Sequence, residues 1–333
     1  MGLVVAREEL DALEPEWREI LPSCSYAPVF LSPLWLRTWW GEFAQTGAGP
    51  GGADRELMLL SVRDDQRLVG VVPLMRDGAH LSFAGDTEVC DYMDFPCTSG
   101  RESEVLSALF RSLGEEPWEE LSLWAMREDS PALAMLPAVT ADFGLTFSKE
   151  AEDVCPQISL PPDIEEYVSS LDKKDRHELR RKLRKLPQAG EVELEVLTSS
   201  EDVQPAIDDF LWMLRESRAD KAEFMTPQME SFFRRLVVNL AGESLLEMIF
   251  LKLGGKRTAA VLCFRGENET LLYNSGYDPA YSAYSVGLLS KALALQRAIE
   301  NGHKRFDFLR GHERYKYELG AKDLNVYKAV IRR

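Results

Sequence analysis

The clearest alternation of apolar and polar positions lies in the second half of the chain. Residues 192–197 alternate between valine or leucine and glutamate, the period-two pattern of a strand with one buried face. Apolar residues then recur at helical spacing over 200–218 and 226–240. Three apolar segments separated by Gly-containing turns follow and predict antiparallel strands at 245–253, 258–264 and 270–277.

A parallel crossover is expected at the end of this half. A polar loop over 278–285 leads into a helix at 286–301, then a strand at 305–309, and a last strand is expected at 325–331. Such a unit places the helix N-terminus at the carboxyl end of the preceding strand, where free N–H groups and the helix dipole favour an anion. The residues there are mostly small or hydroxylic and none is acidic. They predict a phosphate or pyrophosphate site formed by Ser282, Ala283, Tyr284, Ser285, Val286 and Gly287.

The first half combines antiparallel hairpins with a strand–helix–strand unit. Ser32 and Pro33 are suited to begin a helix, whose Trp35 and Trp39 lie on one face and predict core packing. The small residues at 47–53 predict a loop, and no Gly-Lys-Ser/Thr follows them as a Walker loop would require. Strands are expected at 57–62, 68–74, 81–83, 121–124 and 143–148, and helices around 105–113 and 132–136.

Three prolines between positions 155 and 163 mark the expected junction of two domains, because proline does not continue a helix. The 333 residues also exceed the roughly 250–300 at which a single core stops growing. We therefore expect domains over 1–160 and 161–333. Each is expected to be of the mixed α+β class, with a mostly antiparallel sheet flanked by helices.

Charge is distributed unevenly along the chain. There are 39 Lys and Arg against 55 Asp and Glu, a formal net charge of −16, which argues against a general nucleic-acid coat protein. Residues 172–186 nevertheless form a basic amphipathic segment that opens the second domain. Its basic face is either a solvated surface or a contact for the phosphates of a nucleotide cofactor, a lipid carrier or tRNA.

Composition excludes several further classes of protein. With 45% hydrophobic and 28% charged residues the chain is globular, and no apolar run approaches the roughly 18 residues of a membrane span. The N-terminus lacks the basic and apolar segments of a secretory signal, so we expect a cytoplasmic protein. The four histidines lack metal-ligand spacing and the five cysteines are dispersed, so we expect no metal and free thiols.

A motif near the C-terminus carries a family resemblance. Residues 306–316, FDFLRGHERYK, resemble the F-D-F-x-x-G-x-x-x-Y-K signature of CelD-like acetyltransferases and FemABX peptidyltransferases. The order of elements over 191–331 is similar to that of the GNAT superfamily of acyl-CoA-dependent N-acyltransferases, to which both groups belong. Further similarities at 276–278, 172–186, 28–40 and 90–92 extend the resemblance over nearly the whole chain.

The resemblance implies two tandem GNAT-like domains, the first degenerate. It implies transfer of an acetyl or other acyl group from acyl-CoA to an amine or hydroxyl of a small molecule, a sugar or a cell-envelope precursor. FemABX proteins use aminoacyl-tRNA instead, and the basic helix makes tRNA the second candidate partner. The usual GNAT pyrophosphate loop is Gln/Arg-x-x-Gly-x-Gly/Ala, and this chain departs from it at Ser282 and Ser285. That departure motivates a third hypothesis, a non-catalytic binding module.

The resemblance also implies catalytic roles for four residues. GNAT enzymes place a tyrosine general acid after the second crossover strand, where this chain has Tyr315. Lys316 is expected to stabilise an oxyanion or hold a carboxylate or phosphate, unless it is a surface lysine. Asp307 orients the amine, acts as a base, or forms a structural ion pair with Arg310, and Glu313 is the other candidate base.

Substrate contacts are expected at the end of a strand, in the first domain and on the basic helix. In the first domain the alternative is an ordinary turn. The candidates are Tyr277, Asp278 and Arg310 for the acceptor groove, Asp91 and Tyr92 for acceptor contact in the first domain, and Arg180 and Arg181 for phosphates.

Overall fold

The chain folds into two compact units. The computed structural model describes residues 2–43 and 55–333, so the loop expected at 47–53 lies outside the described residues. The first unit consists of Met1–Asp153 and Leu324–Arg333, and the second of Val154–Asp323. Within the described residues, no helix has the length and apolar character needed to cross a bilayer.

The first unit is built on a seven-stranded sheet in the order β1-β2-β3-β4-β5-β13-β6. Strands β4 and β5 are parallel and joined through helix α3, whereas β1–β2, β2–β3, β3–β4 and β5–β13 pair antiparallel. The strands are β1 (Val4–Arg7), β2 (Glu56–Asp64), β3 (Arg67–Asp77), β4 (His80–Phe83), β5 (Glu120–Arg127), β6 (Thr146–Val154) and β13 (Asn325–Arg332). The helices are α1 (Leu10–Ile20), α2 (Pro33–Phe43), α3 (Glu102–Leu113) and α4 (Pro131–Asp142).

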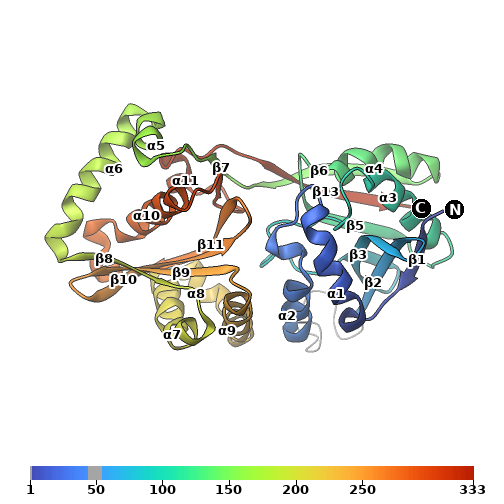
Figure 1. Ribbon diagram of the computed structural model, residues 1–333, viewed down its shortest axis with the longest axis horizontal. Helices are drawn as coiled ribbons and strands as arrows, with labels where there is room; N and C mark the ends of the chain where they lie inside the picture. Colours follow the sequence, from blue (N-terminus) through green and yellow to red (C-terminus); the bar gives the residue numbers. More distant parts are fainter. Residues whose placement is uncertain (1, 44–54) are drawn as a thin grey trace. The chain divides into compact units, whose positions relative to one another are not determined.

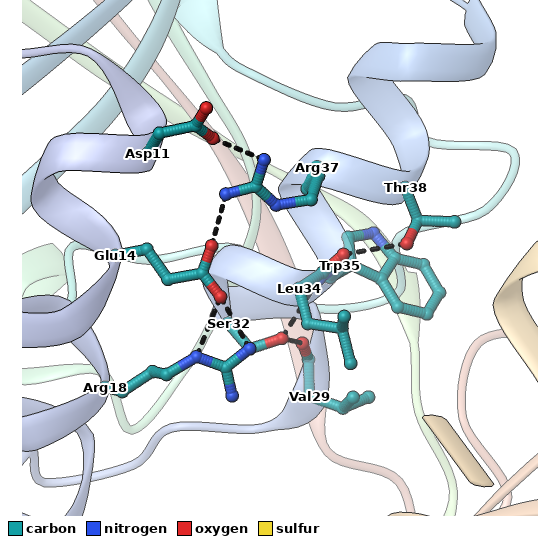
Figure 2. A network of polar contacts seen from close by, with 9 residues as sticks. All are labelled: Asp11, Glu14, Arg18, Val29, Ser32, Leu34, Trp35, Arg37 and Thr38. Atoms are coloured by element: carbon teal, nitrogen blue, oxygen red, sulfur yellow. Dashed lines mark hydrogen bonds and ion pairs between the residues drawn. The ribbon is translucent and has the colours of Figure 1, made fainter. Parts of the chain in front are cut away.

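Helix α2 begins as its sequence predicts. The backbone N–H of Trp35 donates to Ser32 Oγ at 3.1 Å, and the hydroxyl of Ser32 donates to the carbonyl of Val29 (Figure 2). Arg37 of α2 forms ion pairs with Asp11 and Glu14 of α1, which ties the two helices together. Trp35 and Trp39 are buried, so the expected core packing is confirmed.

The last strand belongs to the first unit, whereas the sequence boundaries placed all of 161–333 in the second domain. Strand β13 pairs antiparallel with β5, with Val326 opposite Arg127 and Ile331 opposite Leu121. In Figure 1 the red strand β13 accordingly lies among strands of the first unit. Sequence periodicity predicts the strand itself. It does not predict that this strand pairs with β5, because the two strands are far apart in the sequence and their pairing leaves no local pattern.

The second unit contains a six-stranded sheet in the order β7-β12-β11-β10-β9-β8. Only β11 and β12 are parallel, and helix α10 connects them as the predicted crossover. The strands are β7 (Gln157–Ser159), β8 (Val192–Leu197), β9 (Leu246–Leu253), β10 (Lys256–Arg265), β11 (Glu269–Tyr277) and β12 (Arg305–Asp307). The helices are α5 (Ile164–Ser170), α6 (Lys173–Lys185), α7 (Ser200–Ser217), α8 (Ala219–Phe224), α9 (Pro227–Gly242), α10 (Val286–Glu300) and α11 (Arg314–Glu318).

Helices cover both faces of this sheet. Helices α7 and α9 lie on one face and α10 on the other, as Figure 1 shows. Helix α7 approaches β11 so closely that a Cβ on Gly276 would come within 2.4 Å of the backbone nitrogen of Leu214. Both units are therefore mixed, mostly antiparallel sheets flanked by helices, which confirms the expected fold class.

Candidate active site in the second unit

A cavity of about 280 Å³ opens where the N-terminus of α10 meets the end of β11. Helices α7 and α8 contribute to one part of its wall and helix α11 to another. The lining residues are Ser217, Arg218, Lys221, Ser275, Tyr277, Ser282, Ser285, Val286, Gly287, Leu288, Lys291, Glu313 and Tyr315. All of them belong to the second unit.

The turn before α10 leads directly into the free amides of the helix N-terminus. A 3₁₀ helix, η4 (Pro279–Tyr284), is followed by Ser285 in the left-handed conformation, with φ of 58°. Right-handed residues followed by a left-handed one form concavities lined by N–H groups. Val286 and Gly287 begin α10 and line the cavity, and the first amides of a helix lack intrahelical partners. Gly287 also leaves room for the Tyr277 ring, which would lie 2.8 Å from an added Cβ.

Two lysine side chains enter the cavity from opposite elements. Lys291 of α10 is buried and donates to the carbonyl of Gly287 at 2.6 Å. Lys221 of α8 donates to Asn274 Oδ1 at 3.0 Å and to the carbonyl of Ser275 at 2.5 Å. Burial, together with neighbouring positive charges, lowers the pKa of Lys291 to about 7 and that of Lys221 to about 8.

Helix α11 supplies an acid and a phenol to the same cavity. Burial raises the pKa of the Glu313 carboxyl, but the charge and hydrogen bond of Lys316 outweigh it, so the net pKa is lowered and Glu313 is ionised. Burial and the Glu313 charge raise the pKa of Tyr315, which is therefore protonated at neutral pH. The Lys291 ammonium lies 4.8 Å from the centroid of the Tyr315 ring.

Lys316 does not line the cavity. It is 1% exposed, and its ammonium donates to the carbonyls of Leu309, Arg310 and Gly311 at 2.8–2.9 Å while pairing with Glu313 at 2.9 Å. All the N–H donors of the Lys316 ammonium are therefore used by groups on the loop that follows β12. We therefore assign Lys316 a positioning role, in place of the direct oxyanion or phosphate contact expected from the motif.

Asp307 is likewise outside the cavity. It is fully buried in β12, and its Oδ1 accepts from the backbone N–H of Leu309 at 2.8 Å. Leu309 has φ of 57°, an unfavourable value for leucine, so the carboxylate helps to hold a strained turn. Of the roles expected for Asp307, this geometry supports the structural one and not that of a base or an amine-orienting group. Arg310 is not among the lining residues, and its carbonyl is bound by Lys316.

The other predicted residues divide between the cavity and its surroundings. Tyr277 lines the cavity, whereas the Asp278 carboxylate accepts from the Ala280 N–H and shapes η4. Of the six residues predicted for the anion site, Ala283 and Tyr284 are not in the lining. They contact the basic helix instead, because Lys185 donates to the Ala283 carbonyl at 2.8 Å and lies 5.4 Å from the Tyr284 ring centroid.

The remaining candidates lie away from the cavity wall. Arg180 is exposed on α6, and Arg181 pairs with Glu178 at 2.7 Å on the same helix. Asp91 and Tyr92 are in the first unit, where the buried Tyr92 ring lies 5.1 Å from the Arg127 guanidinium. The five cysteines are free, and burial raises the pKa of Cys90 to about 12, so the Cys90 thiol is not a nucleophile at neutral pH.

The cationic residues of the cavity were not predicted from the sequence. Arg218, Lys221 and Lys291 all line it, and none was a candidate. Lys291 had a detectable signal, because it interrupts the otherwise apolar face of α10 and a buried lysine is rare without a purpose. Arg218 and Lys221 had none, since they lie in a polar segment between two helices.

Comparisons with known proteins agree with this architecture. Residues 173–317, which include the cavity, match the family described as acetyltransferase (GNAT) domain. Residues 173–317 are therefore similar to a GNAT acetyltransferase domain. The matched region covers less than half of the chain, begins at the basic helix α6 and ends in α11. No curated protein matches the sequence at a significant level.

Solved structures share the fold of this chain over both units. A conserved protein of unknown function from Bacteroides thetaiotaomicron is 12% identical, with a TM-score of 0.63 over 99% of this chain and 100% of that one. FemX is 11% identical, with a TM-score of 0.62 over 98% and 96%. The C-terminal domain of a putative lysylphosphatidylglycerol synthetase from Agrobacterium fabrum is 12% identical, with a TM-score of 0.58 over 97% and 92%.

Proposed function

We propose that the second unit is an N-acyltransferase that moves an acyl group from acyl-CoA to an amine or hydroxyl of a small molecule, a sugar or a cell-envelope precursor. The observation that carries the proposal is the single cavity in which the N-terminus of α10, Tyr315 and Glu313 meet. The GNAT family match over these residues agrees with acyl transfer. The first unit is proposed to be the degenerate GNAT-like copy.

The residues present suit the phosphates of CoA. The left-handed Ser285 and the first-turn amides of Val286 and Gly287 form the wall on which a pyrophosphate would lie. Serine at positions 282 and 285 replaces the residues of the usual loop, and the proposal relies on the backbone amides that begin α10. CoA supplies an activated thioester. No metal is needed in this scheme.

Acid–base chemistry follows from the ionisation of the two α11 residues. The ionised Glu313 carboxylate is suited to take the proton that the acceptor amine must lose before attack. The phenol of Tyr315 retains its proton at neutral pH and is suited to protonate the leaving thiolate. Lys316 holds the loop before α11 and thereby positions both residues.

The test is release of free thiol from acetyl-CoA across a panel of amines. We expect Tyr315→Phe to lower kcat by at least tenfold with a smaller change in KM, because the phenol acts on the leaving group. Tyr317→Phe is the matched control, since Tyr317 is exposed and its hydroxyl donates to Asp323. Absence of acetyl-CoA binding by calorimetry would remove the CoA-dependent form of the proposal.

Aminoacyl-tRNA is the second candidate donor, favoured by helix α6. Its exposed basic residues continue to Lys185, which is bonded to the η4 loop beside the cavity. A tRNA donor predicts an affinity that falls steeply with salt. Arg180→Glu with Arg181→Glu is expected to abolish tRNA binding, while Lys256→Glu at the first residue of β10 leaves it intact. Unchanged affinity in the double variant would exclude α6 as the binding surface.

A further inference from the structure

The cavity contains two lysines, Lys221 and Lys291, that form no ion pair in the described part of the chain. Within that part, both bond only to neutral oxygens of Asn274, Ser275 and Gly287. The other charged groups are already paired, Arg218 with Asp220 at 2.7 Å and Glu313 with Lys316 at 2.9 Å. A buried ammonium without an ion-pair partner is costly, and an anion supplied by a ligand would offset that cost.

We propose that Lys221 and Lys291 form a carboxylate-binding site, called the seat below. Its ligand is a carboxylate that a substrate carries close to its reacting atom. The inference rests on the proposed acyl transfer and specifies its substrate class. Either the transferred acyl group ends in a carboxylate, as in a dicarboxylic monoacyl-CoA, or the acceptor amine carries one, as in an amino acid.

The position of the two ammonium groups separates this seat from the phosphate wall. Lys291 lies one turn inside α10 and donates to the carbonyl of Gly287, whereas the free amides belong to the first turn. Lys221 is held against β11 at Ser275. The Lys291 ammonium is 4.8 Å from the ring centroid of Tyr315, the proposed proton donor. An anion bound by Lys291 would therefore lie near Tyr315 and so near the proposed site of acyl transfer.

The electrostatics of the cavity support an anionic ligand. Burial lowers the pKa of Lys291, and Lys221, Lys316 and Arg218 lower it further while Glu313 opposes them. The pKa of Lys221 is likewise lowered by burial and by the charges of Arg218 and Lys316. The carboxylates of Glu313 and Asp220 oppose this shift. A bound carboxylate would favour the charged form of both lysines, so binding takes up protons near pH 8.

The first experiment measures glutarate binding by calorimetry, which requires no catalysis. Glutarate is expected to bind the full chain with proton uptake, detected as a difference in heat between two buffers of unequal ionisation enthalpy at pH 8. Lys291→Met and Lys221→Met are each expected to weaken binding at least tenfold, while Lys256→Met, at the exposed first residue of β10, leaves it unchanged. No binding, binding that ignores both cavity variants, or tighter binding of inorganic phosphate than of glutarate overturns the proposal.

The second experiment identifies which substrate carries the carboxylate. A preference for succinyl-CoA over butyryl-CoA of at least tenfold in kcat/KM, lost in Lys291→Met, assigns it to the acyl group. A similar preference for L-lysine over cadaverine, or L-phenylalanine over phenethylamine, with acetyl-CoA as donor assigns it to the acceptor. Equal rates in every pair overturn the proposal.

These outcomes are distinct from failure of the proposed function. If the unmodified protein neither binds nor cleaves any acyl-CoA, nor uses aminoacyl-tRNA, the transferase assignment fails, and the glutarate measurement still decides whether the seat exists. If acetyl-CoA is bound and cleaved but no carboxylate preference is found, only the seat is overturned.

Discussion

Lys291 shows at the scale of one residue how a functional group opposes stability. Its pKa is about 7 in the folded chain and about 10.4 in an unfolded one, so between these values the unfolded chain holds one more proton. Stability therefore rises with pH across this interval and the cost of Lys291 is largest near and below pH 7. We expect Lys291→Met to raise Tm at pH 7 and the gain to shrink toward pH 10. Thermal unfolding at both pH values measures this.

A control for the Lys291 prediction is available on the surface. Lys304 is exposed, so Lys304→Met is expected to leave Tm nearly unchanged at both pH values. A gain for Lys291→Met of equal size at pH 7 and pH 10 would contradict the argument, because it would then come from packing alone.

Replacing Lys316 by methionine is expected to change stability in the opposite direction from Lys291→Met. The Lys316 ammonium satisfies three backbone carbonyls and Glu313, and removing it leaves all of them without that donor. We expect Lys316→Met to lower the free energy of unfolding by about 3 kcal/mol or more. Urea denaturation at neutral pH measures the loss. Unchanged stability with lost activity would instead support a direct contact with substrate.

At the scale of elements, Gly276 sets the distance between β11 and α7. An added Cβ would meet backbone atoms of Leu214 and Met213 at 2.4 Å, and backbone cannot rotate away as a side chain does. Gly276→Ala is therefore expected to destabilise the second unit by about 2 kcal/mol or more, measured by urea denaturation. Gly41→Ala in α2 is the control, since nothing lies within 4 Å there and alanine favours a helix. Equal effects of the two substitutions would contradict the steric argument.

Periodicity predicted most of the second unit because its elements are long and amphipathic. Strands β8 to β11, helices α6, α7, α9 and α10, and the crossover to β12 all occur near their expected positions. Short elements were missed, among them β1, α5 and α8, because four to seven residues give too little periodicity. Helix α1 was also missed, although it is 11 residues long.

The candidate site was predicted where local sequence determines local shape. The turn before α10 follows from the crossover, and the motif located Tyr315 and Glu313 in the cavity lining. Lys316 belongs to the same motif, but the direction of its ammonium depends on a loop held by a left-handed Leu309. Lys221 reaches the cavity because α8 packs near β11, a tertiary contact that no spacing in the sequence encodes.

For the whole molecule, the path of the chain makes the two units unequal. The second unit is one continuous segment, Val154–Asp323, whereas the first needs the last ten residues to complete its sheet. Strand β13 occupies the place between β5 and β6, and its Val326, Ala329 and Ile331 are fully buried. The first unit therefore cannot reach its full stability until residues 324–333 have been made.

A charge on β13 tests this dependence. Val326→Asp places a carboxylate in the apolar interior of the first unit, which costs several kcal/mol, while leaving every residue of the second unit unchanged. We expect limited proteolysis with mass spectrometry to show rapid cleavage within residues 2–153 and protection of 154–323. Leu262→Asp in β10 is the reciprocal variant and should reverse the pattern, since Leu262 is fully buried in the second unit. Equal loss of protection in both segments with Val326→Asp would mean that the two units unfold as one.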